Sequence, residues 1–165
     1  MARSSTPPLD EGQPFPTFGF GTVAHGHVVL PGHFQDTWGV LLLYRGHWCG
    51  YCRRQLAEFE AALDQLAAER VRVVAASADA LEHATTTAQA LRFPVGFGLS
   101  PEGTSAALGT FREPAYESIG ATGYLVRPTG YVAVATYSTG PIGRLTPADV
   151  IGCVRYYDRV AAGAP

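Results

Sequence analysis

The stretch VLLLYRGHWCGYCRRQL, residues 40–56, decides the fold of this chain. It opens with an uninterrupted apolar run over residues 40–44, which predicts a central strand buried on both faces. Apolar residues then recur at helical spacing, at Leu56, Phe59, Leu63 and Leu66. This spacing predicts a helix over residues 50–69. Cys49 and Cys52 therefore lie where a strand gives way to a helix.

A cysteine pair at this position is typical of a thiol–disulfide redox site. Residues at i and i+3 share one helix face, so the two sulfurs are close enough for a disulfide. The first cysteine meets the free N–H groups of the helix start, which favour a thiolate. Arg45, Arg53 and Arg54 add positive charge nearby, which also lowers a thiol pKa. We therefore predict that Cys49 and Cys52 are the catalytic residues.

Three other interpretations of the pair compete with this one. Two buried thiols without chemistry are less consistent with a position directly after Trp48. A zinc site needs further ligands, and the sequence has no second CxxC and no HxxxH. A cluster held by Cys49 and an external thiol is the third alternative. We expect no metal and no cofactor.

Length and composition limit the classes of protein. A chain of 165 residues suits one domain, predicted over residues 12–162 after a flexible tail over residues 1–11. A net charge of -2 gives no reason to expect nucleic acid or an anionic membrane surface. No apolar run approaches the roughly 18–20 residues of a membrane span. With three cysteines, one is left over from any pairing, and no signal-peptide core is evident, so we expect a cytoplasmic protein.

The rest of the chain predicts an α/β fold. A short hairpin is expected around residues 22–30, and further strands over residues 71–76, 95–99, 123–127 and 131–137. Helices are expected over residues 79–91, with Asp79 as N-cap, from Pro101 to Leu108, and from about Thr146 onward. The order implies a central mixed sheet with helices on both faces, a three-layer sandwich extended by an N-terminal hairpin.

Four segments in this order resemble the peroxiredoxin-like (alkyl hydroperoxide reductase/thiol-specific antioxidant) branch of the thioredoxin-fold superfamily. Residues 12–16 are similar to its "G-x-x-x-P" opening, and residues 43–56 to the "YRGxWCxYCxxQL" stretch of its two-cysteine members. Residues 97–103 resemble "pLLSDPdG", and residues 124–130 resemble the hairpin "FLIDPdG". The resemblance implies a thioredoxin-like fold and a thiol-dependent peroxidase of the CxxC type.

The chain also departs from its relatives around the pair. In the ungapped family register Cys52 takes the peroxidatic position, and Cys49 stands where peroxiredoxins carry a Thr. The Arg that peroxiredoxins place before the strand near Gly123 is missing. Ala121 or Thr122 stands where thioredoxins have a cis-Pro, and Leu43 where they have a buried Asp.

Two reactions can therefore lead to a Cys49–Cys52 disulfide. In the leading hypothesis a thiolate reduces a small hydroperoxide through a sulfenic acid, and a thioredoxin-like or low-molecular-weight thiol recycles the disulfide. The alternative is a dithiol–disulfide oxidoreductase acting on disulfide substrates. A third hypothesis is a non-enzymatic binding module. The helix dipole favours Cys49 as nucleophile, whereas the family register favours Cys52. Homodimers are implied by the resemblance.

Four residues are predicted to shape the site, namely Trp48, Tyr51, Arg45 and Thr122. The alternatives are a packing role for Trp48, a spacer without direct chemistry for Tyr51 and a solvated side chain for Arg45. His47 is a candidate proton donor, and Cys153 a candidate resolving cysteine, although a buried small residue is the favoured interpretation there.

Overall fold

Five strands form the central sheet, and the predicted βαβ unit lies in its middle. The computed structural model describes residues 1–163. In the sheet the strand order is β5-β4-β3-β8-β9, so the apolar run of the opening stretch is the central strand. β3 (Trp38–Leu43) pairs in parallel with β4 (Val71–Ala76) and antiparallel with β8 (Thr122–Val126). The sheet is completed by β5 (Val95–Gly96) and β9 (Val132–Tyr137). The sheet is mixed, as predicted.

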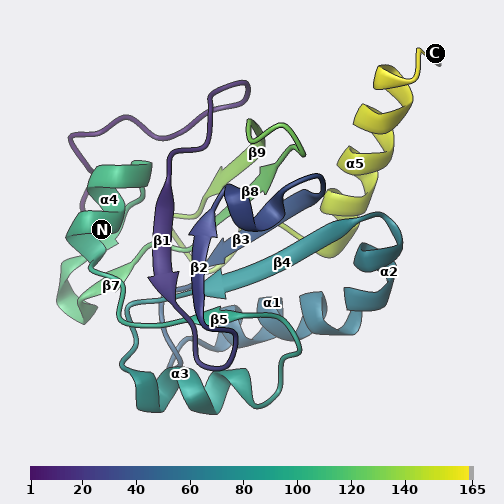
Figure 1. Cartoon of the computed structure of the whole chain (residues 1–165). Coiled ribbons are helices and arrows are strands. Elements are labelled where there is room, and N and C mark those ends of the chain that lie inside the picture. Colours follow the sequence, from purple (N-terminus) through teal and green to yellow (C-terminus); the bar gives the residue numbers. More distant parts are fainter. Residues whose placement is uncertain (164–165) are drawn as a thin grey trace.

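The alternating side chains of β3 divide the core into two layers. Val40 and Leu42 pack on one face with Phe59 of α1 (Gly50–Ala61), and Val150 of α5 (Pro147–Ala161) joins them there. The same layer includes α2 (Leu63–Ala68) and α3 (Leu81–Ala88). On the other face, Leu41 and Leu43 pack with residues of β1 (Phe18–Gly21), β2 (His27–Leu30) and α4 (Pro101–Leu108). Figure 1 shows the hairpin of β1 and β2 crossing one side of the sheet, with α1 and α3 at the other. The predicted sandwich with an N-terminal hairpin is confirmed.

Smaller elements complete the chain. They are η1 (Gly32–Phe34), η2 (Pro114–Tyr116) and the two-residue strands β6 (Arg112–Glu113) and β7 (Ser118–Ile119). They are not evident in the sequence because two- and three-residue elements have no hydrophobic period. The loop that contains η2 brings Tyr116 onto the ring of Trp48, the residue before Cys49.

Two predicted helices differ from the observed ones. The helix expected over residues 50–69 is interrupted at Ala62, where α1 ends and α2 begins after it. The helix expected from Asp79 begins at Leu81, and its N-cap is Ala80, with no side-chain capping bond. The prediction of Asp79 as an N-cap is therefore wrong, because its carboxylate instead accepts hydrogen bonds from the loop before Cys49.

The N-terminal segment, expected to be a loose tail, lies against α4 and the residues that follow it. Ala2 forms an antiparallel bridge with Arg112, and the Ser4 hydroxyl donates to the Ser105 carbonyl at 2.9 Å. The carboxylate of Glu11 accepts a hydrogen bond from the Tyr157 hydroxyl at 2.9 Å.

Candidate active site

Cys49 is the N-cap residue of α1. Its sulfur accepts a hydrogen bond from the backbone N–H of Cys52 at 3.3 Å. The chain leaves β3 at Leu43 and reaches the helix within a few residues, which places this sulfur at the positive end of α1. A free N–H and a helix dipole both stabilise negative charge on sulfur. Of the two sulfurs, that of Cys49 therefore lies at the N-terminal end of α1 and accepts a backbone N–H.

Cys52 lies one turn further along, directly against its partner. The two sulfurs are 2.6 Å apart and not bonded, and the Cys52 thiol donates toward Cys49. Cys52 is fully buried, whereas Cys49 keeps 4% of its surface exposed. Burial, and then the hydrogen bond to Cys49, raise the pKa of the Cys52 thiol to about 11. Cys52 is thus held as a protonated thiol within disulfide reach of Cys49.

The guanidinium of Arg144, in the loop between β9 and α5, lies beside both sulfurs. Arg144 places Nη1 3.5 Å from the Cys52 sulfur and Nη2 4.0 Å from the Cys49 sulfur. Gln55 of α1 holds this guanidinium, because its side-chain oxygen accepts from Nη1 at 3.3 Å. The Gln55 amide in turn donates to the Leu145 carbonyl at 2.8 Å. A positive charge beside a sulfur favours its thiolate form, and Arg144 lowers the pKa of Cys52 against the larger opposing effect of burial.

Arg45, Trp48 and Tyr116 form a stacked group beside the pair. The Trp48 and Tyr116 rings stack with centroids 4.8 Å apart, and the Arg45 guanidinium lies 4.8 Å from the Trp48 centroid. Arg45 reaches Cys52 through its backbone N–H, 3.4 Å from the sulfur, while its guanidinium lies 3.9 Å from the Glu113 carboxylate. Of the two arginines, Arg144 is therefore the one whose side chain contacts the sulfurs.

Asp79 fixes the loop that precedes the cysteines. One of its carboxylate oxygens accepts from the His47 backbone N–H at 2.8 Å, and the other lies 3.0 Å from His47 Nδ1. The Ser77 hydroxyl donates to the same carboxylate at 3.0 Å. The His47 ring stacks on the ring of His83, with centroids 3.8 Å apart. His47 is thus oriented by a nearly buried carboxylate, two residues before Cys49.

The remaining residues predicted from the sequence are Tyr51, Thr122 and Cys153. Tyr51 is 47% exposed on the outer side of α1. Thr122 is buried in β8 opposite Leu43, and its hydroxyl donates to the Gly120 carbonyl at 3.0 Å. Cys153 is half-buried in α5, where burial is the main cause that raises its pKa. It packs against the same core layer as the cysteine pair.

Three residues of this site were not predicted from the sequence, namely Arg144, Gln55 and Asp79. Gln55 offered a signal, since it is a polar residue on the buried side of a helix, one turn after Cys52. Arg144 offered none, because it lies in an irregular loop 92 residues after Cys52. Between residues 1 and 163, no three His, Cys, Asp or Glu side chains gather as metal ligands, and no helix is long and apolar enough to cross a bilayer.

Comparison with known proteins identifies the family of the chain and several solved structures with a similar fold. The AhpC/TSA family model matches residues 12–135. Similar solved structures include AhpC from Enterococcus faecalis, with a TM-score of 0.77 and 14% identity over 95% of this chain and 98% of that one. Peroxidoxin BcpB from Mycobacterium tuberculosis has a TM-score of 0.75 and 15% identity, covering 90% and 97%. A cysteine-to-serine mutant of peroxiredoxin 6 from Arenicola marina has a TM-score of 0.73 and 14% identity, covering 93% and 74%. No curated protein sequence matches the chain.

Proposed function

Because this chain belongs to the AhpC/TSA family and is a peroxiredoxin-like thiol peroxidase, we propose that it reduces small hydroperoxides with Cys49 as nucleophile and Cys52 as resolving thiol. The observation that carries this assignment is the asymmetry of the pair. The Cys49 sulfur accepts a backbone N–H hydrogen bond at the positive end of the α1 dipole. Cys52 is fully buried, and its raised pKa keeps the thiol protonated. The two cysteines therefore have different roles, although they are three residues apart.

The reaction proceeds in two covalent steps. The Cys49 thiolate attacks one peroxide oxygen, an S–O bond forms, the O–O bond breaks, and the leaving oxygen takes a proton to become water or an alcohol. Cys49 is then a sulfenic acid. Cys52 loses its proton and attacks the Cys49 sulfur, the S–O bond breaks, and water leaves with that proton. Two thiol equivalents of an external reductant restore both cysteines and are themselves oxidised to a disulfide.

Peroxiredoxins place an Arg before the strand that corresponds to β8, and this chain lacks it; we propose that Arg144 supplies the positive charge instead. Its guanidinium contacts both sulfurs and therefore stabilises the thiolate of Cys49 before attack and of Cys52 during resolution. In addition, Arg144 has further N–H groups that can donate to a peroxide oxygen as charge develops on it. In this chain Cys49 occupies the sequence position at which peroxiredoxins carry a Thr.

The small exposed fraction of Cys49 supports a small substrate. A protein disulfide must bring its own sulfur to the attacking thiolate, and 4% exposure under the Arg144 loop leaves little room for that approach. We propose for the same reason that a low-molecular-weight thiol is a better reductant than a thioredoxin-like protein. A cytoplasmic location and a homodimer are further proposals, the first supported by the three free cysteines.

Stopped-flow mixing of reduced protein with hydrogen peroxide tests the assignment. We expect a fluorescence change from Trp48 at a rate orders of magnitude above that of a free thiol, and no such change at that rate in Trp48→Phe. In Cys52→Ser a sulfenic acid should accumulate on Cys49 and be trapped by dimedone, while Cys49→Ser should react at the free-thiol rate. A free-thiol rate in the wild-type protein would overturn the proposal in favour of disulfide exchange. Trapping on Cys52 in Cys49→Ser at the wild-type rate would reverse the two roles.

A further inference from the structure

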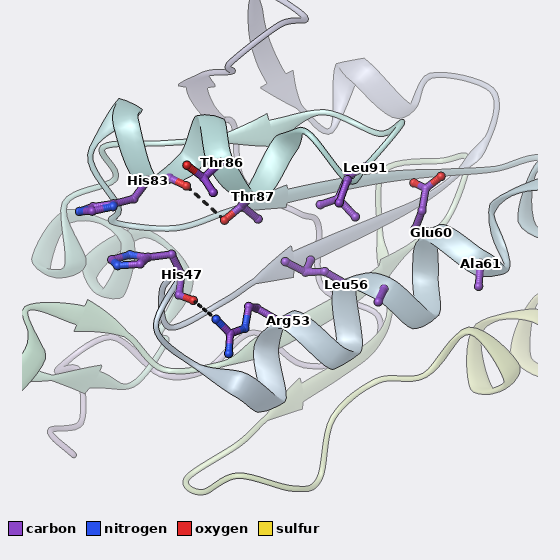
Figure 2. Close-up of a pocket in the computed structure, with 11 residues that line it drawn as sticks. His47, Arg53, Leu56, Glu60, Ala61, His83, Thr86, Thr87 and Leu91 are labelled. Atoms are coloured by element: carbon purple, nitrogen blue, oxygen red, sulfur yellow. Dashed lines mark hydrogen bonds between the residues drawn. The ribbon is translucent and has the colours of Figure 1, made fainter.

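A groove between α1 and α3 is separate from the contacts that serve the sulfurs. Its volume is about 470 Å³, which falls within the range of small-molecule sites. Figure 2 shows His47, His83 and Arg53 at one end and Leu91, Glu60 and Ala61 at the other. The groove follows α1 from Arg53 to Ala61, which at about 1.5 Å per residue corresponds to roughly 12 Å.

The body of the groove is apolar because of small residues and satisfied hydroxyls. Ala57, Ala61 and Ala90 leave space that longer side chains would fill, and Leu56 and Leu91 line it. The hydroxyls of Thr86 and Thr87 donate to the carbonyls of the preceding helical turn, at 3.3 and 3.2 Å. Since these hydroxyls are already paired within α3, the groove offers few polar partners along its length.

The charge is unequal at the two ends. Within residues 1–163 no carboxylate lies within salt-bridge distance of Arg53, and its guanidinium makes one long contact, 3.5 Å to the His47 carbonyl. At the opposite end Arg92 pairs with the Glu60 carboxylate and offsets its charge. Asp79 does not line the groove, and its oxygens are occupied by His47 and Ser77.

We propose that this groove binds an amphipathic monocarboxylate of medium chain length, with the carboxylate at Arg53 and His47 and the chain along Ala57 toward Leu91. A guanidinium provides a paired N–H fork for a carboxylate; the His47 ring, whose Nδ1 faces Asp79, adds a donor at Nε2 in its imidazolium form. An apolar chain displaces water from the alanine and leucine surface. The ligand would therefore bind by its charged end and its apolar body together.

Decanoate, used below its micelle concentration, is the probe for isothermal titration calorimetry on the reduced full-length protein. We expect saturable binding at one site per chain. Arg53→Gln should weaken it at least tenfold, and Ala57→Phe should abolish it by filling the groove. Arg54→Gln is the matched control, because this neighbouring arginine pairs with Glu58 and does not line the groove, so decanoate affinity should be unchanged.

Ligand chemistry provides the second control. 1-Decanol and decylamine should bind at least tenfold more weakly than decanoate, because neither supplies an anion to Arg53. Equal affinity of the three ligands, no saturable binding, or an unchanged affinity in Arg53→Gln would each overturn the proposal. A thermal melt of each variant establishes that it is folded, and the readout is independent of peroxide reduction. A failure here is therefore distinguishable from a failure of the peroxidase assignment.

Discussion

The guanidinium of Arg144 lies 3.5 Å from the sulfur of Cys52, although 92 residues separate the two in the chain. It is also 4.0 Å from the sulfur of Cys49, so a single cation serves both thiols. Its position depends on Gln55, which connects the Arg144 loop to the same helix that carries the pair. The loop and α1 thus form one unit around the sulfurs.

Removing this cation should slow peroxide reduction. In Arg144→Gln the Cys49 thiolate loses a charge-assisted contact, a class of interaction worth about 1.5–3 kcal/mol, so we expect a rate about 10–100 times lower at neutral pH. The rate of Cys49 alkylation by iodoacetamide at neutral pH should also fall, because the sulfur loses a neighbouring cation. Stopped-flow kinetics and mass spectrometry measure the two effects.

The control for Arg144→Gln is Arg54→Gln, which removes the same charge from the exposed pair with Glu58. Its rate should equal that of the wild-type protein. If both variants retain the wild-type rate and alkylation profile, Arg144 has no role in activating the thiol.

The raised pKa of Cys52 predicts how the stability of the reduced protein changes with pH. Below pH 9 Cys52 is protonated in both folded and unfolded chains and contributes no pH dependence. Between about pH 9 and 11 the unfolded chain releases this proton while the folded protein retains it, so the free energy of unfolding falls as pH rises. Because folding raises the pKa of Cys52 from 9.0 to about 11, the free energy of unfolding falls by about 3 kcal/mol in total across this pH range.

Urea unfolding at pH 8 and at pH 10.5, with reductant present, measures this loss. Cys52→Ser does not titrate in this range, so its stability should fall less between the two pH values than that of the wild-type protein. Tyrosines and Cys153 titrate in both proteins, so the difference between the two reports on the Cys49–Cys52 pair. Identical losses would mean that Cys52 is not held protonated by the fold.

The strand of the opening stretch was predictable from its uninterrupted apolar run, and the helix from its hydrophobic period. The alternation of Val40 and Leu42 with Leu41 and Leu43 across the sheet follows from the two-residue repeat of any strand. The pairing of Cys49 with Cys52 follows in the same way from the geometry of one helical turn. These are local properties, and the sequence alone contains them.

The side chains around the sulfurs were less predictable because they come from distant segments. Arg144 lies in the irregular loop between β9 and α5, which carries no period. Asp79 has the residue type and position of an N-cap, and only its distance from His47 in space reveals the other role. The loop of η2 brings Tyr116 onto Trp48 through a turn too short to be recognised in the sequence. Tertiary contacts, rather than local propensity, complete this site.

Loss of the Asp79 carboxylate should loosen the loop before Cys49. In Asp79→Ala the His47 backbone N–H and Nδ1 lose their partner, and since hydrogen bonds to charged groups are worth about 1.5–3 kcal/mol, we expect a destabilisation of that size. Asp79→Asn keeps an acceptor for the backbone N–H and should lose less. Thermal melts rank the variants, and peroxide kinetics should fall in the same order. If Asp79→Ala has the wild-type stability, the carboxylate does not hold the loop.

Gly46 should not tolerate a side chain, because of both its backbone and its surroundings. It has a φ of +149°, and a Cβ built there would lie 2.6 Å from Trp48 Nε1 and 3.0 Å from the Asp79 carboxylate. In Gly46→Ala we expect Trp48 to leave its stack on Tyr116, with a loss of stability of about 1–3 kcal/mol from strain and lost packing. Tryptophan emission should change accordingly, because Trp48 is 39% exposed whereas Trp38 is buried.

Gly50→Ala is the matched control for Gly46→Ala. Gly50 is the first residue of α1, and a Cβ there meets no atom within 4 Å. Alanine is the better helix former, so Gly50→Ala should leave the stability equal or slightly raised and the emission of Trp48 unchanged. Both variants add one methyl group within two residues of Trp48 or Cys49, so a nonspecific effect of bulk near the pair would affect them equally. Equal losses in the two proteins would therefore contradict the specific contact between Gly46 and the Trp48 ring.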